Sequence, residues 1–170
     1  GILSISTIAD VGAGATNLGA PPTDADSPAT APNGVITLGT GTTTGTLLYT
    51  GAITSTDRAV NLAGTTGGGT IDASGSGAIA FTGAFTGTVA GSKTLTLQGS
   101  STEANTLGGA IIDGSGITTV TKVGSGTWVL AGTTSDYSGG TNVNGGILQV
   151  GAGGAGHAVE ELDRIVLRLP

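Results

Sequence analysis

The sequence predicts an all-β protein folded as a parallel β-solenoid, and three observations support that prediction. Short segments of alternating apolar and polar residues, each ending at Gly, Thr, Ser, Asn or Asp, recur between residues 35 and 151. Glycine accounts for 34 of the 170 residues, whereas aromatic residues make up only 3% of the chain. A solenoid has a narrow interior that small aliphatic residues can fill, whereas a β-sandwich usually needs larger side chains between its sheets.

Period-two alternation assigns one face of each segment to the interior, because successive side chains of a strand point to opposite faces. Trp128 and Leu148 lie 148 − 128 = 20 residues apart and Leu62 and Phe81 lie 81 − 62 = 19 apart, intervals typical of one solenoid coil. The predicted core residues are Ile36, Leu38, Val60, Leu62, Ile79, Phe81, Leu95, Leu97, Trp128, Leu130, Leu148 and Val150.

The chain divides into four predicted segments. Residues 1–11 form a strand-like segment, and residues 12–34 form a linker that holds four of the five prolines, which cannot donate to a sheet ladder. Residues 35–151 form the β-solenoid domain. Residues 152–170 form a glycine-rich hinge and a charged amphipathic tail, which contains five of the 16 charged residues (5 basic plus 11 acidic).

Composition excludes several functions. The chain has no cysteine, so we expect neither disulfides nor thiol chemistry. The formal net charge is −6 and the five basic residues are scattered, which argues against nucleic-acid binding. No apolar run is long enough for a membrane-spanning helix. The chain begins at Gly1 rather than Met, which favours a processed product or a fragment.

Residues 121–151, TKVGSGTWVLAGTTSDYSGGTNVNGGILQVG, resemble the autotransporter-associated β-strand repeat, also called the passenger-associated transport repeat. Two departures are Trp128, where an aliphatic residue is usual, and Ser135, where the usual Asn before the tyrosine turn would stand. The positions that match the repeat pattern are Lys122, Gly124, Gly126, Thr127, Leu130, Gly132, Tyr137, Ser138, Gly139, Gly140, Thr141, Val143, Gly146, Leu148 and Val150.

The resemblance implies a single-stranded, right-handed parallel β-helix that is exported across the bacterial envelope. It also implies an extracellular or cell-surface location. The segment from Tyr49 to Ile112 is similar to the regions that precede such repeats in large secreted bacterial proteins, so the resemblance covers about two-thirds of the chain.

The sequence offers no defensible catalytic set. Asp57, Asp72 and Asp113 stand at strand ends or turns, where two of them could pair across neighbouring coils as acid and base. The more common role of such residues is to cap backbone amides. A lone histidine, His157, has no neighbouring ligands, and no calcium-binding nonapeptide repeats are present. We therefore expect a protein that is not an enzyme and has no cofactor or metal.

The two terminal segments are candidates for contacts between copies of the chain, because an uncovered solenoid end leaves strand edges and apolar core exposed. The tail reads either as a helix with Val159, Leu162, Val166 and Leu169 on one face or as a strand, and an ending foreign to the native protein is an alternative explanation of its composition. The candidate contact residues are Ile2, Leu3, Ile5, Ile165, Leu167 and Leu169.

These observations predict a structural extracellular solenoid that forms a homopolymer. A monomeric passenger fragment that acts as an adhesin or stalk on a glycan or host surface ranks second, and a polysaccharide-degrading β-helix enzyme ranks last.

Overall fold

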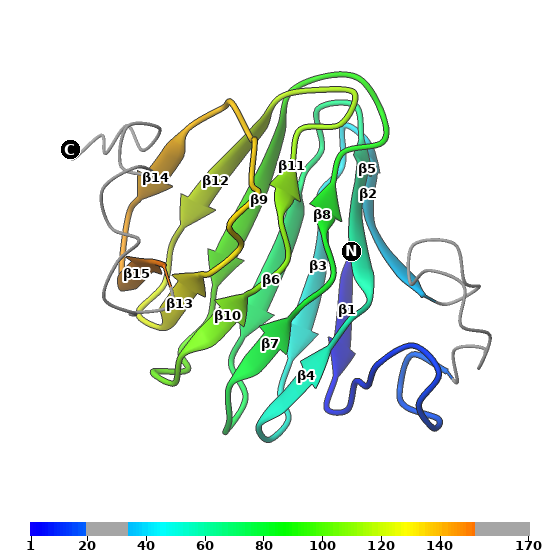
Figure 1. Cartoon of the computed structure of the whole chain (residues 1–170), viewed down its shortest axis with the longest axis vertical. Coiled ribbons are helices and arrows are strands. Elements are labelled where there is room, and N and C mark those ends of the chain that lie inside the picture. Colours follow the sequence, from blue (N-terminus) through cyan, green and yellow to red (C-terminus); the bar gives the residue numbers. More distant parts are fainter. Residues whose placement is uncertain (20–33, 152–170) are drawn as a thin grey trace.

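The computed structural model describes residues 1–19 and 34–151, and in these ranges the chain is a parallel β-solenoid without helices. Three parallel sheets form its walls (Figure 1). The six-stranded sheet contains β1 (Ile2–Ile5), β3 (Gly45–Tyr49), β6 (Gly69–Ala73), β9 (Lys93–Gln98), β12 (Thr118–Lys122) and β14 (Thr141–Val143). The five-stranded sheet contains β4 (Thr54–Thr56), β7 (Ile79–Phe81), β10 (Asn105–Leu107), β13 (Thr127–Leu130) and β15 (Ile147–Val150). The four-stranded sheet contains β2 (Val35–Gly41), β5 (Ala59–Gly64), β8 (Phe85–Thr86) and β11 (Ile111–Ile112).

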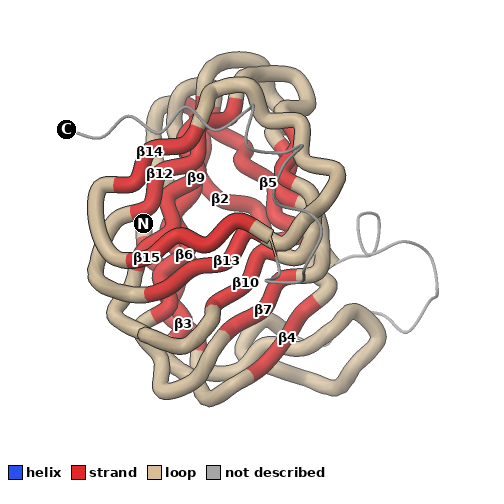
Figure 2. The backbone as a smooth tube through the Cα atoms, turned by 60° about the vertical axis from the view of Figure 1, so that its left-hand side comes forward, coloured by secondary structure: helices blue, strands red, loops and turns tan. Residues whose placement is uncertain are grey.

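The chain visits the four-stranded, six-stranded and five-stranded sheets in turn, so β2–β3–β4 is one coil and β5–β6–β7 the next. Four coils have a strand in every wall, and the last described coil has strands only in two, β14 and β15. Figure 2 shows the strands of successive coils stacked above one another. This stacking satisfies the backbone hydrogen bonds of each strand through the coils on either side.

Coil length changes along the solenoid. Ile36 pairs with Val60, an interval of 60 − 36 = 24 residues, and Thr70 pairs with Thr96, an interval of 26. Trp128 pairs with Leu148, as the 20-residue spacing predicts. The 19-residue spacing is wrong: Leu62 pairs with Leu38 in the four-stranded sheet, whereas Phe81 pairs in the five-stranded sheet. Alternation is the same in every wall, so it does not identify the wall to which a strand belongs.

The N-terminal segment folds back onto its own solenoid. β1 pairs with β3 in the six-stranded sheet, with Ile2 opposite Thr46. The following residues run along β4, where the Thr54 hydroxyl donates to the Ile8 carbonyl at 3.2 Å and the Thr56 hydroxyl to the Ala9 carbonyl at 3.0 Å. The predicted strand of residues 1–11 is therefore a strand only over its first part, and the segment as a whole covers one end of the solenoid.

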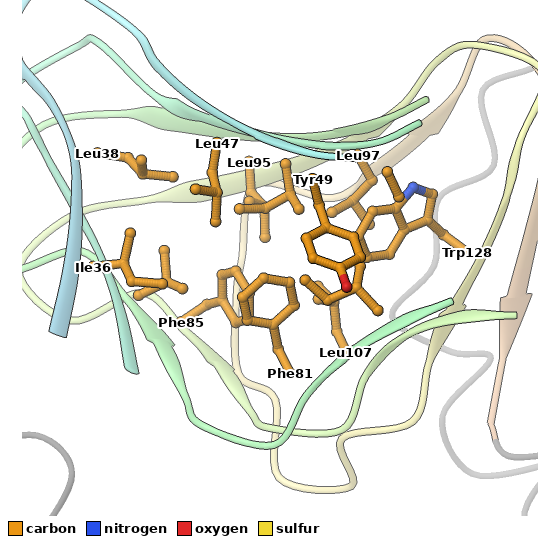
Figure 3. Packing of buried hydrophobic residues seen from close by; sticks show 14 of the residues in the cluster. Ile36, Leu38, Leu47, Tyr49, Phe81, Phe85, Leu95, Leu97, Leu107 and Trp128 are labelled. Atoms are coloured by element: carbon orange, nitrogen blue, oxygen red, sulfur yellow. The ribbon is translucent and has the colours of Figure 1, made fainter. Parts of the chain in front are cut away.

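Aliphatic and aromatic side chains from all three walls fill the interior. In Figure 3, Leu47 and Leu95 of the six-stranded sheet point toward Phe81 and Leu107 of the five-stranded sheet. Phe81 and Phe85 pack edge to face with ring centroids 5.5 Å apart. Every aromatic residue of the chain lies in this core or packs against it, so the described surface offers no exposed aromatic platform.

Candidate functional site

The predicted core residues lie mostly where the alternation places them. Leu148 is half-buried against the cluster, and Val150 is 38% exposed because it lies on β15, the outermost strand of its sheet. The ten residues within the buried core cluster are Ile36, Leu38, Val60, Leu62, Ile79, Phe81, Leu95, Leu97, Trp128 and Leu130.

The three aspartates considered as catalytic groups each hold the backbone or a neighbouring side chain. Asp57 accepts a hydrogen bond at 2.6 Å from the Val11 N–H through Oδ1. Asp72 accepts one at 2.7 Å from the Gln98 side-chain amide through Oδ2. These bonds link each carboxylate to a neighbouring coil, a structural role that requires no substrate.

Asp113 has a similar role at the turn that follows β11. Its Oδ1 accepts from the Thr118 N–H at 2.6 Å, and its Oδ2 accepts from the Ser138 N–H at 2.9 Å and from the Ser138 hydroxyl at 2.5 Å. Its own N–H donates to Oδ1 of Asp136 at 3.1 Å. Within residues 1–19 and 34–151, no group of three or more His, Cys, Asp or Glu side chains could hold a metal ion. His157 lies outside the described residues.

Arg58 is the most informative buried charge, with a side chain only 1% exposed. Its Nε donates to the Ala9 carbonyl at 3.2 Å and its Nη2 to the Gly19 carbonyl at 3.3 Å, so the guanidinium binds two points of the N-terminal segment. Burial lowers the pKa of Arg58, and the neighbouring Asp57 carboxylate raises it. The buried cation thus joins the N-terminal segment to the body of the solenoid.

Two lysines are also buried, and both direct their ammonium groups at backbone carbonyls of glycine-rich turns. Lys122 donates to the carbonyls of Val123 at 2.7 Å, Gly124 at 3.0 Å and Gly145 at 3.0 Å. Lys93 donates to the Gly91 carbonyl at 3.1 Å and to that of Val89. Burial lowers the pKa of the Lys122 ammonium. Lys122, a matching position of the repeat motif, therefore fixes two successive corners of the solenoid.

Asn105 joins three coils from inside the five-stranded sheet. Its side-chain oxygen accepts from the Ile79 N–H at 3.1 Å, and its side-chain nitrogen donates to the Thr127 carbonyl at 2.9 Å. The same nitrogen lies 3.1 Å from the Glu103 carbonyl. Sequence analysis overlooked this residue and the buried lysines, although the alternation contains a signal: Lys93 and Lys122 have the same parity as Leu95 and Val120 in their strands.

The candidate contact residues of the N-terminus do not behave alike. Ile2 is 74% exposed and Leu3 47% exposed, but Ile5 is 2% exposed and belongs to the chain's own core. The expectation that Ile5 contacts another copy is therefore corrected, because its side chain points inward beside Tyr49, its partner in β3. Ile165, Leu167 and Leu169 lie outside the described residues, as does the whole of the predicted tail, residues 152–170.

Comparison with known proteins found one match. The family model described as passenger-associated-transport-repeat matches residues 120–150, the coil formed by β12, β13, β14 and β15. No curated protein and no solved structure compared with the chain matched it. Within the described residues no helix is long and apolar enough to cross a membrane. The last described coil of this solenoid is a passenger-associated transport repeat, as its motif predicts.

Proposed function

We propose that the chain is a non-catalytic structural β-solenoid of the passenger type, located outside the cell or on the bacterial cell surface, which assembles head to tail into a filament or surface matrix. The observation that carries this proposal is the exposure of apolar groups at both described ends. Ile2 and Leu3 are exposed on β1, and Ile147 and Val150 are 60% and 38% exposed on β15. Apolar surface at a strand edge is a common site of association.

The edge strands themselves favour pairing. β1 (ILSI), β14 (TNV) and β15 (ILQV) contain no charged residue and no proline, the features that usually protect an edge from another strand. β1 and β14 are the two edges of the same parallel sheet. Parallel pairing of β14 in one copy with β1 in the next would extend that sheet, and such unlike contacts form open filaments unless their rotation closes a ring.

The test is electron microscopy of the purified chain at neutral pH beside two single variants and one truncation. Val150→Lys places a charge at the exposed edge and should abolish filaments, whereas Val89→Lys, a change at a side-facing residue of similar exposure (36%), should leave them intact. A version ending at Gly156 shows whether the predicted tail contributes to the contact. Filaments that survive Val150→Lys would contradict the proposed interface.

A monomeric passenger fragment that acts as an adhesin or stalk is the alternative, and short single rods in every sample would support it over assembly. A polysaccharide-degrading enzyme is the remote alternative. Asp72 is the carboxylate best suited to test it, because Asp72→Asn removes the charge of a residue on the outer face of β6 without changing its size. A polysaccharide-cleaving activity that disappears in this variant would favour the enzyme.

A further inference from the structure

Four threonines form a straight row across the outer face of the six-stranded sheet. Thr46 pairs with Thr70, Thr70 with Thr96, and Thr96 with Thr121, one threonine from each of four successive coils. We call these residues the threonine row. No register shift occurs in the pairings of this sheet, so the row runs directly across the strands (Figure 1).

A second, shorter row lies beside the first. Thr94 and Thr119 are register partners, and each precedes a member of the threonine row by two positions. Neighbouring strands lie about 4.7–4.9 Å apart, and alternate residues of one strand lie about 6.5–7 Å apart. The two rows together therefore present a two-dimensional grid of methyl and hydroxyl groups, which we call the threonine face.

The hydroxyl groups of this face are available to a ligand. Within the described residues, the hydroxyls of Thr46, Thr70, Thr96, Thr121 and Thr94 have no hydrogen-bond partner, and only that of Thr119 donates, to the Gly139 carbonyl at 3.2 Å. Threonines elsewhere use their hydroxyls internally, as the hydroxyl of Thr50 does when it donates to the Ile5 carbonyl at 3.2 Å.

The surroundings of the grid exclude two common kinds of ligand. No charged residue lies in either row, and the nearest carboxylate, Asp72, is held by Gln98 and by Ser74. A charged partner therefore finds no counter-charge on this face. All aromatic residues pack in or against the core, so a sugar ring finds no stacking surface.

Ordered water fits the grid better than either. Oxygen atoms on the prism faces of hexagonal ice repeat in two perpendicular directions at intervals similar to the two spacings of the threonine face. Hydroxyl groups at such intervals can each bond one water of a layer, while the methyl groups between them leave that layer undisturbed by competing polar groups. We propose that the threonine face binds the surface of ice.

The test measures enrichment of the fluorescently labelled chain in a slowly grown ice hemisphere, together with the growth rate of single ice crystals. The wild-type chain should concentrate in the ice and slow its growth. Thr96→Tyr inserts a bulky ring at the centre of the grid and should lose most of both effects. Its matched control is Thr106→Tyr, a change at an outward position of β10 in the five-stranded sheet.

Melting temperature and Trp128 fluorescence show that both variants keep the fold, since Trp128 is fully buried in the core. A wild-type chain that is excluded from ice, or equal activity in the two variants, would overturn the proposal. Retention on an insoluble polysaccharide that depends on Thr96 would assign the face to a glycan and overturn it as well. Filament formation is scored separately, so this proposal and the proposed assembly can fail independently.

Discussion

At the scale of single residues, the solenoid depends on a few buried polar side chains that bond to the backbone of adjacent coils. Asn105, Arg58, Lys93 and Lys122 are each at most 2% exposed and each reaches backbone carbonyls. Such groups are costly to bury alone and become favourable only when their hydrogen bonds are complete. They are therefore the positions at which a single substitution should be most informative.

Replacement of Asn105 tests the connection between coils. Asn105→Leu keeps the approximate size of the side chain but leaves the Ile79 N–H and the Thr127 carbonyl without their partner. Each unsatisfied buried group costs about 1–3 kcal/mol, so the free energy of unfolding should fall by several kcal/mol in denaturant titration. Asn142→Ala, at a half-buried outward position of β14, is the control and should change it by less than about 0.5 kcal/mol. Equal effects would contradict the role assigned to Asn105.

The buried ammonium of Lys122 predicts a pH dependence with a definite sign. Burial lowers its pKa below the ordinary 10.5, so between the folded and unfolded pKa values the unfolded chain binds more protons. The free energy of unfolding therefore rises with pH in this alkaline window, up to about 10.5. Lys122→Met lacks the ionisable group, and the wild-type chain should gain stability relative to this variant as the pH is raised from 7 to 10.

The comparison with Lys122→Met removes the contribution of Tyr49, which is common to both proteins. Burial raises the pKa of Tyr49, so its contribution is complete below pH 10 and is lost above it, the opposite sign and a different window. A stability difference that stays constant from pH 7 to 10 would show that Lys122 titrates as it does in the unfolded chain.

At the scale of elements, the corners between strands require glycine because consecutive coils approach closely there. A Cβ added to Gly109 would clash with the carbonyl oxygen of Gly83 in the preceding coil, and one added to Gly132 would meet that of Gly109 at 2.5 Å. The corner glycines thus form columns along the solenoid. The regular stops between strands in the sequence are the places where the backbones of neighbouring coils pack against one another.

Gly109→Ala tests this packing. The added methyl group meets backbone rather than a flexible side chain, so the corner must shift, and overpacking of this kind costs about 1–3 kcal/mol. Gly14→Ala is the matched control, since nothing lies within 4 Å of the position of its Cβ. Thermal unfolding should show a lower melting temperature for Gly109→Ala only, and similar values for the two variants would mean that the corner has room to move.

At the scale of the whole molecule, each coil contacts only the coils beside it, so stability should propagate from neighbour to neighbour. The N-terminal end is covered by residues 1–10, with Ile5 and Ile8 buried, whereas β15 at the other end leaves Val150 partly exposed. The two ends of the described solenoid are therefore unlike. This asymmetry is what makes a head-to-tail contact geometrically reasonable.

Leu130→Asp tests the coupling between coils. Leu130 lies on β13 between Leu107 of β10 and Val150 of β15, and an unpaired carboxylate there costs several kcal/mol or more. Hydrogen exchange should therefore show loss of protection in β10, β13 and β15 together, while β1 and β3 stay protected. Gln149→Asp, an outward change on β15, is the control. A variant that exchanges and melts like the parent would show that Leu130 does not face the interior.

The sequence by itself determined the fold class, most of the core and the repeat at residues 120–150, because alternation and turn residues are local properties of the chain. The tertiary structure decided which wall each strand joins, the change in coil length from 26 to 20 residues, and the folding of residues 1–19 onto their own solenoid. It also decided that Arg58 and Lys122 are buried. Parallel pairing joins residues about a whole coil apart, and whether a cation can be buried depends on carbonyls contributed by another coil.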